Sequence, residues 1–458
     1  MKETLPQEFI ARMKALLKDE YEAFEAALEE PPPVSIRINP MKTNHSNGDP
    51  IPWCSTGYYL PERPSFTFDP LFHAGIYYVQ EASSMFLEQI VKKTGGKTVL
   101  DLCAAPGGKS THLTAILPEE SLLVSNEVVR SRCNILTENM HKWGAPNVII
   151  TNNDPRDFKT LRGVFDLILA DLPCSGEGMF RKDPASRAEW SLNNIRLCAE
   201  RQRRIVRDVW DALRPGGYLI YSTCTYNLEE NEDNIRQLAE QLNARIIPVH
   251  PGMTVKKFFP HKAKGEGFSI AILQKDSGDE LPNAKKFKPL VRSLNYPEAS
   301  EWLKHPEDYF IDARGDKLYA ISLIHKYLYQ SISENMKVLS AGIPLATLKG
   351  RDLIPSPALA LNSQFSPAPA FPKIPLTFDD AIKYFRRESL TLPADTPKGF
   401  VLVTYENHPL GFMKNLGARA NNLYPQEWRI RATSNPQYTC KYPFERVPAP
   451  FHPAYKHC

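Results

Sequence analysis

Two cysteines stand in short loops that each follow an apolar, strand-like run. Cys174 lies in "ADLPCSGEG" after "FDLILAD", and Cys224 lies in "YSTCTYN" after "GGYLI". A thiol in such a loop is open to reagents, and its thiolate is a strong nucleophile once neighbouring groups help it to ionise. These positions predict nucleophilic chemistry, whereas Cys133 and Cys198 stand within expected helices and fit buried, inert thiols.

Strands and helices alternate through the part of the chain that holds both cysteines. The expected strands are residues 97–105, 121–127, 147–154, 165–173, 216–224 and 267–275, and the expected helices are 107–117, 128–143, 199–213 and 229–242. This alternation predicts a parallel sheet with helices on both faces. Because ligands of such sheets bind at the carboxyl ends of the strands, we expect the two cysteines to share one crevice.

The stretch "DLCAAPGGKST" joins the first of these strands to its helix. It is not a triphosphate loop, because Cys103 stands where that motif needs its first glycine, and a G-x-G-x-x-G dinucleotide fingerprint is absent. Its tight glycine turn can bind a carboxylate through backbone N–H groups. Glu127 ends the second strand, where an acid accepts ribose hydroxyls, and Asp154 ends the third, suitably placed for an adenine amino group. This set favours S-adenosylmethionine over NAD; the alternative for each acid is helix capping.

Three motifs carry a family resemblance: "DLCAAPGGKS", "DLPCSGEGMFRKDP" and "YSTCTYNLEENE". In this order and spacing they resemble the Sun-type RNA cytosine-C5 methyltransferases. The resemblance implies a Rossmann-like class I methyltransferase core with an antiparallel last strand, S-adenosylmethionine as cofactor, and no metal. The residues that it places at or beside the cofactor are Cys103, Ala104, Ala105, Pro106, Gly107, Gly108, Lys109, Glu127, Arg132, Asp154 and Asp171.

The implied reaction explains why two thiols are useful. Cytosine C5 is a poor nucleophile until a thiolate adds to C6, and after methyl transfer the C5 proton and the thiol must both leave. Local chemistry does not decide which cysteine attacks, since the DNA enzymes that form the same product use a cysteine after proline, as in Cys174. The resemblance to the RNA family implies that Cys224 attacks, that Cys174 assists release, and that Asp171 hydrogen-bonds the base edge.

Four parts are expected along the chain. Residues 1–92 form an N-terminal helical or α+β extension, and residues 93–280 form the methyltransferase core. Residues 281–372 form a connecting α+β module with a proline-rich linker, "IPSPALALNSQFSPAPAFPKIP". Residues 373–458 resemble, through "PLGF", "NNLYP" and a basic ending, the β-rich PUA-type RNA-binding domain of bacterial enzymes that modify small-subunit ribosomal RNA.

The partner implied by these resemblances is 16S ribosomal RNA or the 30S subunit. Arg37 in "SIRIN" and Arg181-Lys182 resemble family positions near the substrate, while the arginine-rich stretch 196–207 has a solvated helix face as its commoner interpretation. The net charge of +4 slightly favours binding to polyanions. Scattered cysteines without a regular framework predict a reducing compartment, the cytoplasm. We expect no membrane span, since no run of about 18 apolar residues occurs, and we expect a monomer.

Two other functions compete with RNA methylation. A DNA cytosine methyltransferase would use Cys174 for attack and would prefer duplex DNA. A non-enzymatic RNA-binding or ribosome-assembly factor would keep only a remnant of the cofactor site; the presence of every expected chemical residue counts against it.

Overall fold

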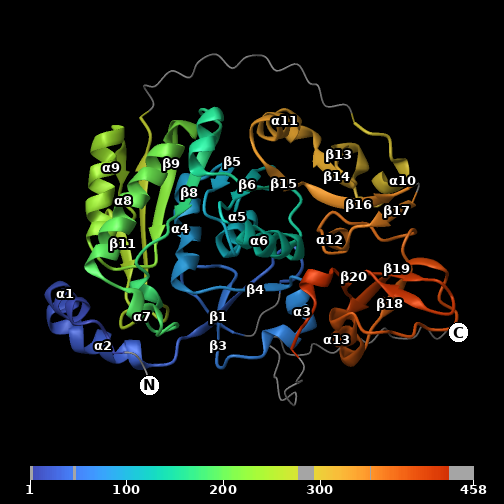
Figure 1. The fold of residues 1–458 in the computed structure, drawn as a ribbon, viewed down its shortest axis with the longest axis horizontal. Helices are drawn as coiled ribbons and strands as arrows, with labels where there is room; N and C mark the ends of the chain where they lie inside the picture. Colours follow the sequence, from blue (N-terminus) through green and yellow to red (C-terminus); the bar gives the residue numbers. More distant parts are fainter. Residues whose placement is uncertain (1–3, 45–47, 277–292, 351, 433–458) are drawn as a thin grey trace, which may run out of the picture.

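A computed structural model describes residues 4–44, 48–276, 293–350 and 352–432 (Figure 1). The boundary expected at residues 280 and 281 lies outside these described residues. The same is true of residues 433–458 of the C-terminal module, which include Cys440 and Cys458.

The centre of the molecule is a nine-stranded sheet in the order β10-β12-β9-β8-β5-β6-β7-β15, with β11 paired to β12. Its strands are β5 (Thr98–Asp101), β6 (Leu122–Asn126), β7 (Val148–Thr151), β8 (Phe165–Asp171), β9 (Leu213–Thr223), β10 (Arg245–Ile247), β11 (Val255–Phe258), β12 (Phe268–Gln274) and β15 (Val338–Ala341). Strands β9, β8, β5, β6 and β7 run parallel, and β12 is antiparallel to β9. The expected Rossmann-like core with an antiparallel last strand is confirmed.

Helices cover both faces of this sheet. They are α4 (Leu87–Thr94), α5 (Gly108–Ile116), α6 (Arg130–Trp143), α8 (Leu192–Val209), α9 (Asn234–Leu242) and α11 (Lys326–Asn335). Val99 of β5 packs with apolar residues of α4, α5 and α6, whereas the next residue, Leu100, packs with those of α8, α9 and α11. Successive strand residues point to opposite faces, so the fold is a three-layer sandwich.

The N-terminal extension packs against the segments that follow the two cysteines. It contains α1 (Gln7–Leu17), α2 (Tyr21–Glu29), α3 (Pro70–His73) and a sheet of β2 (Asp49–Pro50), β3 (Gly57–Leu60), β1 (Val34–Ile38) and β4 (Tyr77–Val79). Phe9 and Phe24 pack against Phe180, Trp190 and Tyr226. Phe180 and Trp190 follow Cys174 in the chain and Tyr226 follows Cys224, so these helices support the site from behind.

The connecting module extends the core sheet. Its own sheet has the order β13 (Tyr309–Arg314), β14 (Lys317–Ser322), β16 (Ile343–Lys349), β17 (Asp352–Pro355), and its short helix α10 spans Pro297–Ser300. β15 leaves this module and pairs antiparallel with β7 of the core. β13 and β14 form an antiparallel pair around the turn at Gly315.

The proline-rich stretch of this module is not the linker that its composition suggested. It contains α12 (Pro357–Ala360), and Leu359, Phe365 and Phe371 are buried in one cluster with residues of β16, β19 and β20. Proline marks breaks in regular structure but does not imply exposure, and the apolar residues between the prolines have a core to fill.

The C-terminal module is anchored to the N-terminal extension. It contains β18 (Lys373–Pro375), α13 (Phe378–Arg386), β19 (Gly399–Tyr405), β20 (His408–Asn415) and β21 (Ala420–Asn422). Phe385 of α13 stacks on His73 at 4.4 Å between ring centroids, and Tyr424 lies within hydrogen-bonding distance of the same imidazole. In Figure 1 this module and the connecting module lie at the opposite end of the molecule from α1 and α2.

Candidate active site

The two loop cysteines meet at the ends of neighbouring parallel strands. Asp171 at the end of β8 pairs in register with Ser222 near the end of β9, so the loops that follow start side by side. The Sγ atoms of Cys174 and Cys224 lie 3.1 Å apart, and both residues are partly buried. The structure therefore brings together the two residues that sequence reasoning placed in one crevice.

A lysine–aspartate pair lies at the same strand ends. Lys109 Nζ donates to Asp171 Oδ2 at 2.7 Å, and Ser222 Oγ donates to Asp171 Oδ1 at 2.7 Å. Burial disfavours the charge of Lys109, but Asp171 and Asp101 outweigh it and raise the pKa of this lysine. Lys109 also interacts electrostatically with Cys224, so a fixed positive charge acts on that sulfur.

Cys174 holds its proton more tightly than an ordinary thiol. Its hydrogen bond with Cys224 and its burial raise its pKa well above the usual value. A protonated Cys174 can therefore donate to the sulfur of Cys224. Burial also raises the pKa of Cys103, which fits a lining residue and not a reagent.

The turn after β5 forms a cradle of backbone atoms. Gly107 has a φ of 113°, which favours glycine, and it caps the start of α5. Arg132 Nη2 donates to the carbonyl of Ala105 at 2.7 Å and fixes the turn against α6. A cavity of about 170 Å³ opens beside it. The cavity is lined by Tyr78, Val79, Gln80, Glu81, Ser84, Cys103, Ala104, Ala105, Pro106, Gly108, Lys109 and Asp171.

Glu127 offers a free acceptor at the end of β6. Its Oε1 accepts from the backbone N–H of Val129 at 2.8 Å, which holds the carboxylate in place. Its Oε2 is buried and accepts no hydrogen bond from the described residues, although Arg132 Nη1 lies 3.3 Å away. A buried carboxylate oxygen without a hydrogen bond is costly unless a ligand supplies one.

Asp154 is engaged locally. Its side chain accepts from the backbone N–H of Arg156 at 3.1 Å and from Arg156 Nε at 2.9 Å, as part of a capping box with Asp157. This is the capping role that competed with adenine binding for each acid, and an adenine contact at Asp154 stays a prediction.

Two arginine positions expected near the substrate form hydrogen bonds within the protein, and their place beside the substrate stays a prediction. Arg37 is fully buried and donates to Gln80 and Thr111. The Arg181 guanidinium donates to the carbonyls of Glu30, Pro31 and Gly265. Each guanidinium donates to acceptors on segments that are far away in the chain.

Sequence reasoning missed four acids and aromatics near the crevice. Tyr78 and Glu81 of the N-terminal extension line the cavity beside the glycine turn. Glu177 and Glu230 are almost fully buried behind the cysteine loops. The two glutamates stand in the quoted motifs, "SGEG" and "EENE", but an acidic side chain is commonly exposed, so nothing indicated burial.

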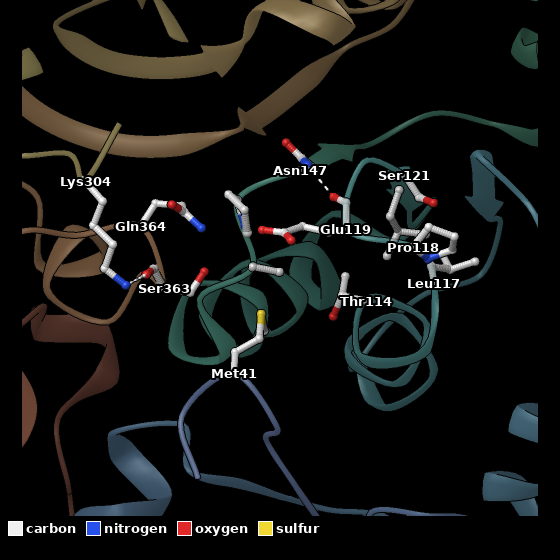
Figure 2. Close-up of a pocket in the computed structure, with 13 residues that line it drawn as sticks. Met41, Thr114, Leu117, Pro118, Glu119, Ser121, Asn147, Lys304, Ser363 and Gln364 are labelled. Atoms are coloured by element: carbon white, nitrogen blue, oxygen red, sulfur yellow. Dashed lines mark hydrogen bonds between the residues drawn. The ribbon is translucent and has the colours of Figure 1, made fainter. Parts of the chain in front are cut away.

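A larger cavity lies at the amino ends of the parallel strands, away from the cysteine loops. It measures about 400 Å³ and lies between the residues just before β6 and β7 and the connecting module, as Figure 2 shows. Asn147 Nδ2 donates to the carbonyl of Glu119, and Lys304 Nζ donates to that of Ser363. Because parallel strands share one direction, their amino ends lie away from the crevice, and this cavity contains no cysteine.

One group of metal-ligand types occurs among the described residues, away from the cysteine pair. The donor atoms of Cys54, Glu88 and His112 lie within 4.8 Å of one another and all three residues are buried. Glu88 already accepts from Lys92 and from the backbone N–H of Ser55. The expected absence of a metal from the reaction stays a prediction. Within the described part of the chain, no helix is long and apolar enough to cross a membrane.

Three features define a Rossmann-like methyltransferase fold: five parallel strands with the antiparallel β12 beside β9, a glycine turn after β5, and an acid after β6. A methyltransferase homologue from Pyrococcus horikoshii is 27% identical, with a TM-score of 0.52 over 59% of this chain and 95% of its own. The NSun6 structure from the same organism is 23% identical, with a TM-score of 0.51 over 60% of this chain and 99% of its own. These structures support the fold.

Comparisons with protein families and with individual relatives indicate the same methyltransferase family over most of the chain. The family described as 16S rRNA methyltransferase RsmB/F matches residues 88–274, the N-terminal domain of 16S rRNA methyltransferase RsmF matches 5–82, and the methyltransferase RsmF PUA domain matches 371–430. Ribosomal RNA small subunit methyltransferase F of Escherichia coli (strain E2348/69) is 31% identical over 92% of this chain and 96% of its own, and that of Erwinia tasmaniensis is 30% identical over the same shares. The chain belongs to the ribosomal RNA small subunit methyltransferase F family. The Sun-type resemblance and the PUA-type module are thereby confirmed.

Proposed function

We propose that this protein transfers a methyl group from S-adenosylmethionine to C5 of a cytosine in 16S ribosomal RNA, through a transient bond between Cys224 and C6. The observation that carries the proposal is the 3.1 Å contact of Cys174 and Cys224 beside the Lys109–Asp171 pair. The relatives named for ribosomal RNA small subunit methylation support the RNA substrate.

The residues around the glycine turn fit the cofactor. The Oε2 of Glu127, which accepts no hydrogen bond and lies 3.3 Å from Arg132 Nη1, can accept a ribose hydroxyl, and the N–H groups at the start of α5 can receive the amino-acid carboxylate. An added Cβ at Gly108 would lie 3.3 Å from the Tyr78 ring, so the cradle has little spare room there. When bound, S-adenosylmethionine supplies the electrophilic methyl group.

Two side chains lie close enough to act on the Cys224 sulfur. The thiol of Cys174 can donate a hydrogen bond to the Cys224 sulfur, since the two Sγ atoms lie 3.1 Å apart, and Lys109 interacts electrostatically with Cys224. The Cys224 thiolate adds to C6 of the cytosine, the S–C6 bond forms, and C5 becomes a carbon nucleophile that takes the methyl group. Asp171 lines the cavity beside the glycine turn and ends the strand that leads into the loop of Cys174, and it holds the edge of the base.

The methylated base is released from Cys224 by an elimination. The C5 proton leaves to a base, and the electron pair of the C5–H bond expels Cys224 as a thiolate while the S–C6 bond breaks. Cys174 assists because its thiol can donate a hydrogen bond to the departing thiolate. One cysteine thus attacks C6, and its neighbour assists the elimination that frees the methylated base.

RNA is held by surfaces outside the crevice. Exposed Arg419, Arg429 and Arg431 lie on the C-terminal module, whose family match is a PUA domain. Exposed Arg201 and Arg204 lie on α8 of the core. The base must leave its stack to reach the thiols, and contacts on both sides can hold the flanking RNA while it does so.

Labelled methyl donor, incubated separately with free 16S rRNA, 30S particles, tRNA and duplex DNA, tests the proposal. We expect incorporation only with 16S rRNA or 30S particles, and 5-methylcytidine after digestion to nucleosides. Methylated duplex DNA would favour the DNA-enzyme alternative. Tight RNA binding without incorporation into any substrate would favour a non-enzymatic assembly factor.

A further inference from the structure

Glu177 is a buried carboxylate on the loop of Cys174 that binds the loop of Cys224. Its Oε2 accepts from Thr225 Oγ1 at 2.6 Å and from the backbone N–H groups of Tyr226 and Asn227 at 2.8 and 2.9 Å. Its Oε1 accepts from Trp190 Nε1 at 3.1 Å. All these donors are neutral, so four hydrogen bonds, and not a cation, offset the burial of this acid.

Glu230 binds the loop of Cys174 from the segment that follows Cys224. It follows Cys224 in the chain, is fully buried, and accepts from the backbone N–H of Ser175, the residue after Cys174, at 3.0 Å. Gln202 Nε2 and Asn227 Nδ2 each donate to it at 2.8 Å. Gln202 Nε2 also donates to the carbonyl of Pro173 at 3.0 Å, so both neighbours of Cys174 are held.

Each of the two loops therefore has a glutamate that accepts hydrogen bonds from the other loop. Further direct contacts join them: Gly178 N–H donates to the carbonyl of Cys224 at 2.9 Å, and the hydroxyls of Ser175 and Thr225 lie 3.0 Å apart. Each acid binds the residue that follows a reacting cysteine: Glu177 binds Thr225, and Glu230 binds Ser175. If either acid lost its donors, a buried carboxylate would lack partners, so the loops are stable only in this mutual arrangement.

We propose that Glu177 and Glu230 are positioning residues that set the distance between the sulfurs of Cys174 and Cys224. The proposal rests on the proposed function only for its catalytic consequence, since the sulfur distance is measurable without substrate. Methyl transfer and release need both thiols at one base, and a displacement of about 1 Å in such an arrangement can lower a rate by about 100-fold.

The test uses Glu177→Gln and Glu230→Gln in the full chain, with diamide as oxidant. In wild type, the two thiols should lose two protons and two electrons to diamide and form a Cys174–Cys224 disulfide, detected by mass spectrometry of linked peptides. Each substitution places an amide NH₂ among donors and should slow this cross-linking by about tenfold or more, because disulfide formation requires close, oriented sulfurs. In parallel, kcat for RNA methylation should fall about 100-fold with little change in cofactor affinity.

Asp69→Asn is the matched control, because Asp69 is also a buried carboxylate that accepts from a backbone N–H and a hydroxyl, those of Leu71 and Tyr77. It should lower the melting temperature yet cross-link at the wild-type rate. If a glutamate variant fails to fold, Thr225→Val removes one donor to Glu177 and should slow cross-linking by a smaller factor.

Cross-linking at the wild-type rate in both glutamate variants, or equal slowing in Asp69→Asn, would overturn the positioning role. Absence of RNA methylation by wild type, with cross-linking still dependent on both glutamates, would refute the proposed function and leave the positioning role standing.

Discussion

The free oxygen of Glu127 predicts a specific loss of cofactor affinity. Glu127→Gln keeps an oxygen to accept from the Val129 N–H and replaces Oε2, which accepts no hydrogen bond and forms an ion pair with Arg132, with a donor. A hydrogen bond to a charged acceptor contributes about 1.5–3 kcal/mol. At a factor of ten for each 1.4 kcal/mol, the affinity for S-adenosylmethionine should fall by about 10- to 150-fold.

Titration calorimetry with S-adenosylmethionine and S-adenosylhomocysteine measures this loss in wild type and variant. Glu240→Gln on the exposed surface of α9 makes the same change of net charge and serves as the control. At saturating cofactor the methylation rate should change little. An affinity within twofold of wild type, or the same loss in Glu240→Gln, would refute the assignment of Glu127 to the ribose.

Three further predictions address the base, the RNA surface and pH. Asp171→Ala should lower the single-turnover methylation rate by at least about 100-fold while calorimetry shows a much smaller loss of cofactor affinity; lost affinity with a normal rate would contradict this role. Arg419→Gln, Arg429→Gln and Arg431→Gln together should weaken RNA binding and reduce the salt dependence of the binding constant by about 0.7–0.9 per lost phosphate contact, and an unchanged slope in filter binding would contradict it. Burial raises the pKa of Asp101 to about 7, so its protonated form stabilises the fold fully below pH 4, and this contribution is lost as pH rises to 7. Urea unfolding of the cofactor-free protein should therefore show that Asp101→Asn removes about 2–3 kcal/mol of the stability loss between pH 5 and 7, and parallel pH profiles for the two proteins would refute it.

The layout of the crevice was predictable because it follows from order along the chain. Strands separated by helices must run parallel, and their carboxyl ends share one edge, so Asp171, Cys174 and Cys224 had to meet there. The glycine turn and Glu127 follow from the same rule.

Other features depended on contacts between distant segments. The burial of Arg37 arises from acceptors on α5, and the burial of Glu177 from donors on a loop about fifty residues later. β15 joins the core sheet from the connecting module, and no local pattern in "VLSA" identifies its partner strand. These contacts join segments that are distant in the sequence, so local residue type and spacing do not reveal them.

The most direct test of the account asks which cysteine bonds to RNA. Labelled RNA and S-adenosylmethionine are incubated with Cys174→Ala, Cys224→Ala and the double variant, and each mixture is run on a denaturing gel. Cys174→Ala should accumulate a slow-migrating protein–RNA adduct, because Cys224 attacks and release is impaired. Cys224→Ala and the double variant should show none. An adduct from Cys224→Ala, with none from Cys174→Ala, would reverse the roles and contradict the proposed mechanism.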